Sequence, residues 1–244
     1  MDWIYGIHTV NEIIKYSSEN ITDFCILDGS KNPRLIELCH QAQKRGIKIR
    51  YLNNRDLSEL VDGLHQGVAI LCKPKPYLKE NELLDLVKHY GEKAFILVLD
   101  GVTDPRNIGS LVRSAVSFNI DGLIIKERHY PSESKLMYKA ASGSMEYLNI
   151  FEVSNINSTL KNLREKNFWV YGFDGKGNKD FTDIEWKGNN ILLFGSEGAG
   201  MHFHTSKYAD FLVKISIDKK IESLNISNSA TIVFHYLSYL KKKS

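Results

Sequence analysis

Residues 95–113 read FILVLDGVTDPRNIGSLVR. The apolar run at 95–99 predicts a strand that is buried on both faces, because a half-exposed strand would alternate with polar residues. A polar turn follows, and it leads into a helix that we expect to begin near Asn107. A strand, a tight turn and a helix in this order are typical of the repeating unit of a parallel sheet.

The same alternation continues to the end of the chain. Further strands are predicted at 122–125, 169–173, 191–194 and 211–215. Helices are predicted near 107–118, 133–141, 155–167 and 225–241. The pattern predicts an α/β fold with a doubly wound, mostly parallel sheet. The last helix carries an apolar stripe, which fits packing on the sheet as well as it fits a subunit interface.

A smaller α/β unit precedes this region. It is predicted to contain a helix at 8–16, a strand at 24–27, a second helix that Asn32 caps and Pro33 begins, and strands at 47–52 and 68–71. Alternating lysine and proline at 73–76 predict an extended connection. We therefore expect a domain at 1–72, a linker at 73–80 and a second domain at 81–244.

Composition excludes several classes of protein. Of the 244 residues, 43% are hydrophobic and 25% are charged, which is ordinary for a globular chain. No apolar stretch reaches the roughly 18 residues of a membrane span, and the N-terminus does not resemble a signal peptide. The three cysteines form no C-x-x-C pair and the histidines lack a metal-binding spacing, so we expect no disulfide framework, no metal and a cytoplasmic location.

The positive charge of the chain is concentrated near its N-terminus. The net charge is only +3, but residues 31–55 carry seven Lys or Arg against one acid. Such a stretch can meet the phosphates of RNA, but for an isolated patch a solvated helix face and a strand end are the preferred explanation. The candidate RNA contacts are Lys31, Arg34, Lys44 and Arg45.

Polar segments follow three of the predicted strands, at the edge where open α/β sheets bind ligands. The first holds Asn107, which by itself is explained as a helix cap, and Arg113. Arg113 lies in a small, apolar stretch of helix, where a buried arginine needs an anion such as a phosphate.

The second and third segments are short. Residues 194–201 read FGSEGAGM, and their glycines match neither the dinucleotide fingerprint nor the P-loop. Residues 223–227 read SLNIS and contain several residues that can cap a helix. From residue chemistry alone, the three segments predict only a polar site at several strand ends.

In combination, the three segments resemble the motifs of the SpoU family of RNA ribose methyltransferases. Residues 107–113 match N-x-G-x-x-x-R, residues 194–201 match F-G-x-E-G-x-G-M, and residues 223–227 match S-L-N-x-S. In addition, YGIH at 5–8 and HQGV at 65–68 are similar to the ends of the small substrate-binding domain in the 23S rRNA guanosine 2′-O-methyltransferase branch. The resemblance covers nearly the whole chain.

This resemblance implies a fold whose C-terminal segment is threaded into a trefoil knot. It implies that S-adenosylmethionine binds there, between the loops of the second and third motifs, with Gly195, Gly200, Ile215 and Leu224 as contacts. It also implies a homodimer in which both subunits contribute to the site, and 23S rRNA as the substrate.

The implied reaction transfers a methyl group to a ribose 2′-hydroxyl. We expect Arg113 to engage this hydroxyl and the adjacent phosphate. Since a free arginine is a very poor base, any base role needs help from the phosphate or another group. Asn107, Glu197, Ser223 and Asn225 are expected to orient Arg113 and the ribose.

The chain departs from the family pattern at two positions beside the third motif. Ser216 stands where the family usually has proline, and Lys219 stands where a glycine usually follows. We expect the first change to loosen the loop and the second to disfavour a positive φ. The alternative functions are the same reaction on tRNA, a catalytically silent RNA-binding protein, and an unrelated nucleotide-using enzyme.

Overall fold

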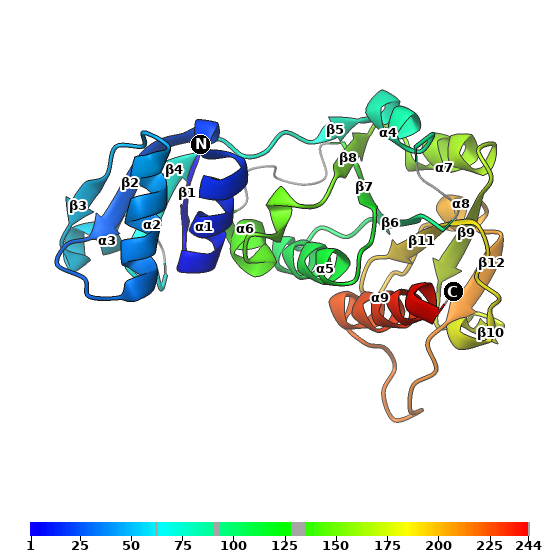
Figure 1. The fold of residues 1–244 in the computed structure, drawn as a ribbon. Coiled ribbons are helices and arrows are strands. Elements are labelled where there is room, and N and C mark those ends of the chain that lie inside the picture. The colour runs from blue at the N-terminus through cyan, green and yellow to red at the C-terminus, as the bar shows by residue number, and fades with distance from the viewer. Residues whose placement is uncertain (62, 90–92, 128–134, 244) are drawn as a thin grey trace. The chain divides into compact units, whose positions relative to one another are not determined.

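The computed structural model describes residues 1–61, 63–89, 93–127 and 135–243 (Figure 1). The chain forms two compact units. Unit 1 combines Met1–Pro76 with Ser132–Tyr147, and unit 2 combines Tyr77–Pro131 with Leu148–Ser244.

Unit 1 is built on a four-stranded sheet in the order β1-β4-β2-β3. Its strands are β1 (Asp2–Tyr5), β2 (Ile21–Leu27), β3 (Arg50–Leu52) and β4 (Val68–Cys72). β4 is antiparallel to β1 and β2, whereas β3 is parallel to β2. Its helices are α1 (Ile7–Tyr16), α2 (Pro33–Lys44), α3 (Asn54–Leu60) and α6 (Lys135–Ala141), with single 3-10 turns at Ser18–Asn20 and Ser144–Glu146.

Local sequence signals explain most of unit 1. The Asn32 side chain accepts a hydrogen bond of 3.0 Å from the backbone N–H of Arg34, and Pro33 is the first helical residue, so the predicted start of α2 is confirmed. The strand predicted at 47–52 is shorter and begins only at Arg50. α6 confirms most of the helix predicted at 133–141, whose first two residues lie outside the described part of the chain.

Unit 2 is built on an eight-stranded sheet in the order β10-β12-β9-β11-β6-β7-β8-β5, and all of its neighbouring strands are parallel. The strands are β5 (Leu78–Lys79), β6 (Phe95–Asp100), β7 (Gly122–Lys126), β8 (Ile150–Val153), β9 (Phe168–Phe173), β10 (Lys179–Asp180), β11 (Asn189–Gly195) and β12 (Phe211–Lys214). The five predicted strands of this sheet are confirmed, and so is its parallel character. β5, β8 and β10 are additional.

Helices lie on both faces of this sheet (Figure 1). They are α4 (Glu80–Leu86), α5 (Pro105–Ser117), α7 (Ile156–Arg164), α8 (Phe203–Ser206) and α9 (Ile226–Lys243), with a 3-10 turn at Phe181–Asp183. Ile96 and Val98 of β6 face a core that includes Leu83 of α4 and Leu160 of α7. α5 and α9 pack against each other on the other side. No helix in the described ranges has the length and apolarity that a membrane span requires.

Candidate active site

The carboxyl ends of β6, β11 and β12 lie at one edge of the sheet of unit 2, because parallel strands end on the same side. β6 leads into α5, β11 leads into a short hairpin, and β12 leads into the loop before α9. In Figure 1 that last loop extends well away from the sheet before the chain returns as α9. The three motif segments therefore meet at a single edge.

The first segment places Asn107 in the first turn of α5. The helix is capped by Asp104, whose side chain accepts a hydrogen bond of 2.9 Å from the N–H of Arg106, and Pro105 is its first residue. The interpretation of Asn107 as the helix cap is therefore wrong. Because Asp104 already caps α5, the Asn107 side chain is available for contacts with the other segments.

The second segment folds back on itself directly after β11. Ser196 and Gly200 exchange backbone hydrogen bonds of 3.0 and 2.9 Å. A Cβ atom on Gly195 would lie 2.0 Å from the carbonyl carbon of Gly200, so a side chain at 195 would prevent this hairpin. The hairpin presents Glu197 as an exposed residue.

The third segment starts α9 and ties it to α5. Asn225 caps the helix, since its Oδ1 accepts a hydrogen bond of 2.9 Å from the N–H of Ser227. The Ser227 hydroxyl donates to the backbone oxygen of Asn107 at 3.2 Å. The Thr231 hydroxyl, one turn later, donates to Ser114 on α5 at 2.7 Å.

The side chains of Asn107, Glu197 and Asn225 form one hydrogen-bonded cluster, which we call the triad. Glu197 Oε1 accepts hydrogen bonds from Asn107 Nδ2 at 3.1 Å, Asn225 Nδ2 at 2.5 Å and the N–H of Ile226 at 3.2 Å. Asn107 Oδ1 accepts a further bond of 3.0 Å from Asn225. Both amides donate toward the carboxylate, which also lies at the positive end of α9.

The second oxygen of Glu197 differs from the first. Within the described residues, Oε2 accepts no hydrogen bond, and the residue is exposed. The carboxylate is thus held firmly through one oxygen while the other remains able to accept a bond from an amine or a hydroxyl.

Arg113 does not join the triad. It is exposed, so the expectation of an arginine buried in an apolar stretch is wrong, and it forms no ion pair within the described ranges. Six positions along a helix turn the side-chain direction by about 120° from that of Asn107. Arg113 therefore projects to a different side of α5 from the triad.

The remaining candidates lie in the loop between β12 and α9. Ile215 and Leu224 are half-buried, whereas Ser223 is exposed and makes no hydrogen bond to the triad. The backbone of Lys219 does not adopt a positive φ, so its conformation does not require the glycine that is usual in the family.

A tether at Ser216 was not predicted. The backbone N–H of Ser216 donates to Asp180 Oδ2 at 2.9 Å, a bond that proline cannot make. Burial by itself raises the pKa of Asp180, but hydrogen bonds from Ser216 and Thr182 outweigh it and lower the pKa to about 2. The residue that replaces proline therefore ties the loop to β10 rather than loosening it. Only knowledge that β10 pairs with β12 could have revealed the hydrogen bond between Ser216 and Asp180.

A second unpredicted pair involves His202. Asp100, at the end of β6, is buried, and its carboxylate accepts a bond of 2.8 Å from the N–H of His202 and lies 2.8 Å from Nδ1 of the same residue. The sequence offered His202 no acidic partner because Asp100 precedes it by 102 residues. In the described part of the chain, no group of three or more His, Cys, Asp or Glu side chains is placed to hold a metal ion.

The candidate RNA contacts in unit 1 do not form one compact patch. Lys31 and Arg34 lie at the start of α2, whereas Lys44 and Arg45 lie at its end. All four are exposed. Arg45 also donates a hydrogen bond of 3.0 Å to the backbone oxygen of Lys15. The positive charge is therefore spread along the length of α2.

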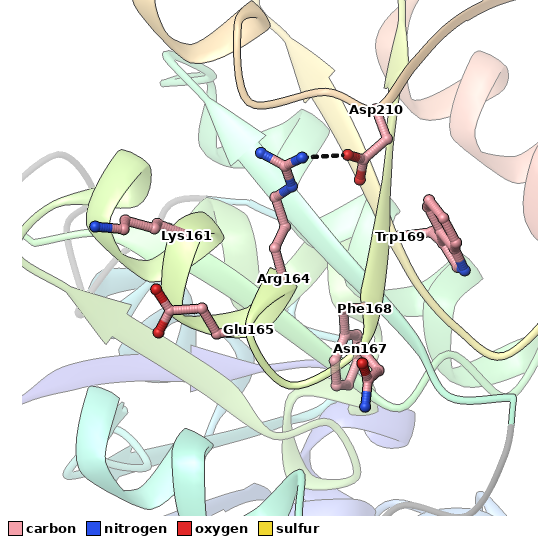
Figure 2. Close-up of a pocket in the computed structure, with 7 residues that line it drawn as sticks. All are labelled: Lys161, Arg164, Glu165, Asn167, Phe168, Trp169 and Asp210. Atoms are coloured by element: carbon pink, nitrogen blue, oxygen red, sulfur yellow. Dashed lines mark ion pairs between the residues drawn. The ribbon is translucent and has the colours of Figure 1, made fainter.

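A hollow of about 560 Å³ lies at the opposite end of the large sheet, where β9 and β12 begin (Figure 2). Arg164 forms an ion pair of 2.6 Å with Asp210 across it. The other lining residues are Lys161, Glu165, Asn167, Phe168 and Trp169. None of these residues belongs to the three motif segments. The hollow is therefore separate from the triad.

Two family models match the chain. Residues 94–235 match the SpoU rRNA Methylase family, and residues 3–78 match the RNA 2′-O ribose methyltransferase substrate binding domain. The match to the first model covers more than half of the chain, and it contains all three motif segments.

Named relatives and solved structures agree with these matches. The chain is 33% identical to the 23S rRNA (guanosine-2′-O-)-methyltransferases RlmB of Escherichia coli strain K12, over 93% of both chains, and of Xanthomonas campestris, over 92% of this chain and 91% of the relative. The SpoU methyltransferase AviRb from Streptomyces viridochromogenes, in complex with AdoMet, superposes with a TM-score of 0.80 at 19% identity, covering 99% of this chain and 91% of that one. The chain belongs to the SpoU rRNA methylase family.

Proposed function

We propose that this protein transfers a methyl group from S-adenosylmethionine to the ribose 2′-hydroxyl of a guanosine in 23S rRNA. The observation that carries the proposal is the triad, which joins the three motif segments into one site at the carboxyl edge of a parallel sheet. Relatives with this activity share a third of their residues with the chain over nearly its whole length. A ribose hydroxyl as acceptor explains a preference for RNA over DNA.

The residues present fit S-adenosylmethionine. The ligand carries positive charge on its sulfonium and its amine, and Glu197 offers a carboxylate oxygen that no described residue occupies. Half-buried Ile215 and Leu224 offer apolar contacts for its adenine ring. We propose that these two residues hold the ligand together with Gly195 and Gly200. When bound, it supplies a methyl group on a sulfonium, which is already a strong electrophile.

The side chains of this protein must then orient the acceptor and ease the loss of its proton. The planar guanidinium of Arg113 suits the phosphate beside the ribose, and it stabilises negative charge as the hydroxyl proton leaves. The proton leaves by way of the phosphate oxygen to solvent rather than to Arg113, which stays protonated. The triad joins the first turn of α5 to the start of α9 and so helps to fix the position of the acceptor. Ser223 contributes a hydroxyl group to the same site.

Three finer features complete the proposal. The loop between β12 and α9 is threaded into a trefoil knot around the cofactor site, as in the family that the motifs resemble. Residues 1–72 form the RNA-binding domain, 73–80 a linker and 81–244 the catalytic domain, and the separate matches at 3–78 and 94–235 support this division in outline. Within it, residues 132–147 pack with unit 1, and β5 in the linker pairs with β8 of the large sheet. The protein works in the cytoplasm, where its rRNA substrate is made.

The active species is a homodimer. Arg113 projects away from the triad of its own chain, which favours a site completed by a second copy. α9 leaves Ile232 and Tyr239 exposed, at 42% and 49%, and these side chains are available to pack against that copy. Sedimentation velocity checks this assignment, because a monomer at micromolar concentration contradicts it.

The decisive experiment supplies methyl-labelled S-adenosylmethionine with separate pools of 23S rRNA and tRNA. We expect label in 23S rRNA only, at a single guanosine, and loss of labelling when that nucleotide is replaced by 2′-deoxyguanosine. Labelling of tRNA would support the same reaction on another RNA. Binding of RNA without any binding of S-adenosylmethionine in calorimetry would support a silent member of the family.

A further inference from the structure

Phe203 is an aromatic side chain that the fold leaves in solvent. It begins α8, just after the second motif, and is 70% exposed. A single exposed apolar residue is ordinary on a protein surface. The position of Phe203 and the groups around it distinguish it from such a residue.

Contacts with β6 fix this part of the chain at the edge that carries the triad. His202 is bonded through its N–H and its ring to the buried Asp100, the last residue of β6. Asp100 in turn pairs with Gly195 at the end of β11. Phe203, the next residue after His202, therefore emerges beside the loops that follow β6 and β11.

Groups that can carry positive charge flank the phenyl ring. Lys207 Nζ lies 4.4 Å from its centroid, a cation–π distance, and the ring of His204 meets it edge-on at 5.6 Å. Thr205, between them, is buried and holds the turn in place. The result is an exposed aromatic side chain with a cation over one face of its ring, on a fixed backbone.

We propose that Phe203 stacks on a nucleobase of the RNA substrate next to the methylated ribose, while Lys207 and His204 face the neighbouring phosphates. Unpaired bases bind aromatic side chains in this way, and adjacent cations neutralise the backbone. The inference rests on the proposed function and deepens it. It adds a residue that positions the substrate and that belongs to none of the three family motifs.

A matched control exists at the other end of the same sheet. Trp169 is also aromatic and 47% exposed, and Figure 2 shows it at the hollow that contains Lys161 and Arg164. Its side chain points to the face of β9 opposite to that of Phe168 and Val170, which pack with α7, and its ring lies 5.8 Å from that of Phe211. It therefore controls for an exposed aromatic ring and not for a nearby cation. It lies at the start of β9, however, away from the edge that carries the triad. If RNA binds at the edge of the sheet that carries the triad, Phe203 contributes to RNA affinity and Trp169 does not.

The test compares Phe203→Ala, Phe203→Leu, Phe203→Tyr and Trp169→Ala in the full-length protein. Filter binding to deproteinised 23S rRNA at one fixed salt concentration gives Kd, methyl transfer gives KM and kcat, and calorimetry gives the affinity for S-adenosylmethionine. We expect Ala and Leu at position 203 to raise both Kd and KM for RNA at least about fivefold, with cofactor affinity unchanged. Tyr at 203 and Ala at 169 should leave all four quantities unchanged.

Two results of the binding assay would overturn the inference. One is an unchanged RNA affinity in Phe203→Ala, and the other is an affinity that Leu restores as well as Tyr, which would indicate simple apolar contact. A change of oligomeric state in sedimentation velocity would assign Phe203 to a protein interface instead. If wild-type protein methylates no RNA, the proposed function fails, but the RNA Kd values still decide whether Phe203 contacts RNA.

Discussion

The two ends of the eight-stranded sheet each hold a carboxylate, and the two carboxylates are used differently. At the amino end, both carboxylate oxygens of Asp210 bind other parts of the fold. One forms an ion pair with Arg164 at 2.6 Å, and the other accepts a hydrogen bond from the N–H of Val170 at 2.9 Å. At the carboxyl end, Glu197 receives three donors on one oxygen and leaves the other without a partner among the described residues. Both oxygens of Asp210 therefore serve the fold, whereas the exposed Glu197 keeps one oxygen that can accept a bond from an amine or a hydroxyl.

The most severe test of this comparison is Glu197→Gln. The substitution keeps the shape of the side chain but removes its charge. An NH₂ group takes the place of one of the two carboxylate oxygens. We expect kcat/KM to fall about 10²- to 10³-fold, as for other preorganised electrostatic groups. The midpoint of thermal unfolding should change little, because the side chain is exposed. A variant that retains near-normal methyl transfer would show that the triad is only a helix cap.

The second test concerns the exposed arginine of α5. Arg113→Lys keeps the charge but loses the planar fork that suits a phosphate, and we expect methyl transfer to fall about 10- to 100-fold. Arg106, on the same helix and exposed, is the matched control, and its replacement by Lys should have no comparable effect. Full activity and unchanged RNA affinity in Arg113→Lys would remove Arg113 from the site.

Asp210→Asn tests the opposite end of the sheet. The substitution weakens the bonds to Arg164 and Val170, and we expect it to lower the free energy of unfolding by about 1–2 kcal/mol, because the Arg164 side chain is 46% exposed and partly screened. Chemical denaturation measures this effect. Activity per folded molecule should stay normal, and a specific loss of methyl transfer would contradict the division between the two ends.

The smallest expected effect is the pH dependence of the Asp180 tether. Because the pKa of Asp180 falls from 3.8 to about 2 on folding, its stabilisation is present above the unfolded pKa and is lost as the pH falls toward 2. The difference in stability between wild type and Asp180→Asn should therefore shrink from pH 5 to pH 2. We expect that difference to be below about 1 kcal/mol at pH 5. A difference that does not vary with pH would exclude an ionised tether.

Local patterns predicted the parts of the fold that local physics determines. Apolar runs identified the five central strands, and Asn32 with Pro33 identified the start of α2. The two-residue strands β5 and β10 were not predicted, because two residues show no periodicity and depend on pairing with a distant segment.

The candidate site was less predictable from residues alone. Asn107 and Asp104 are both good caps, and only Pro105, which fixes the first helical position, decides between them in the structure. The pairs Asp100–His202 and Asp180–Ser216 join segments that no local pattern connects. The family resemblance grouped the three motifs, but it did not place Arg113 away from the triad.

The all-parallel order of the large sheet also has a kinetic consequence. Residue 190 must meet residue 95, and β12 must enter between β9 and β10 after both have been synthesised. Contacts between such distant segments slow folding, since the entropy of closing long loops is lost before the pairing energy is gained. During translation, the edge of β6 therefore remains open to wrong partners while residues 101–195 are made, which takes roughly 5 to 19 seconds at ordinary rates of synthesis. The triad needs Asn225, which follows β12, so it can form only after all of these strands have been made.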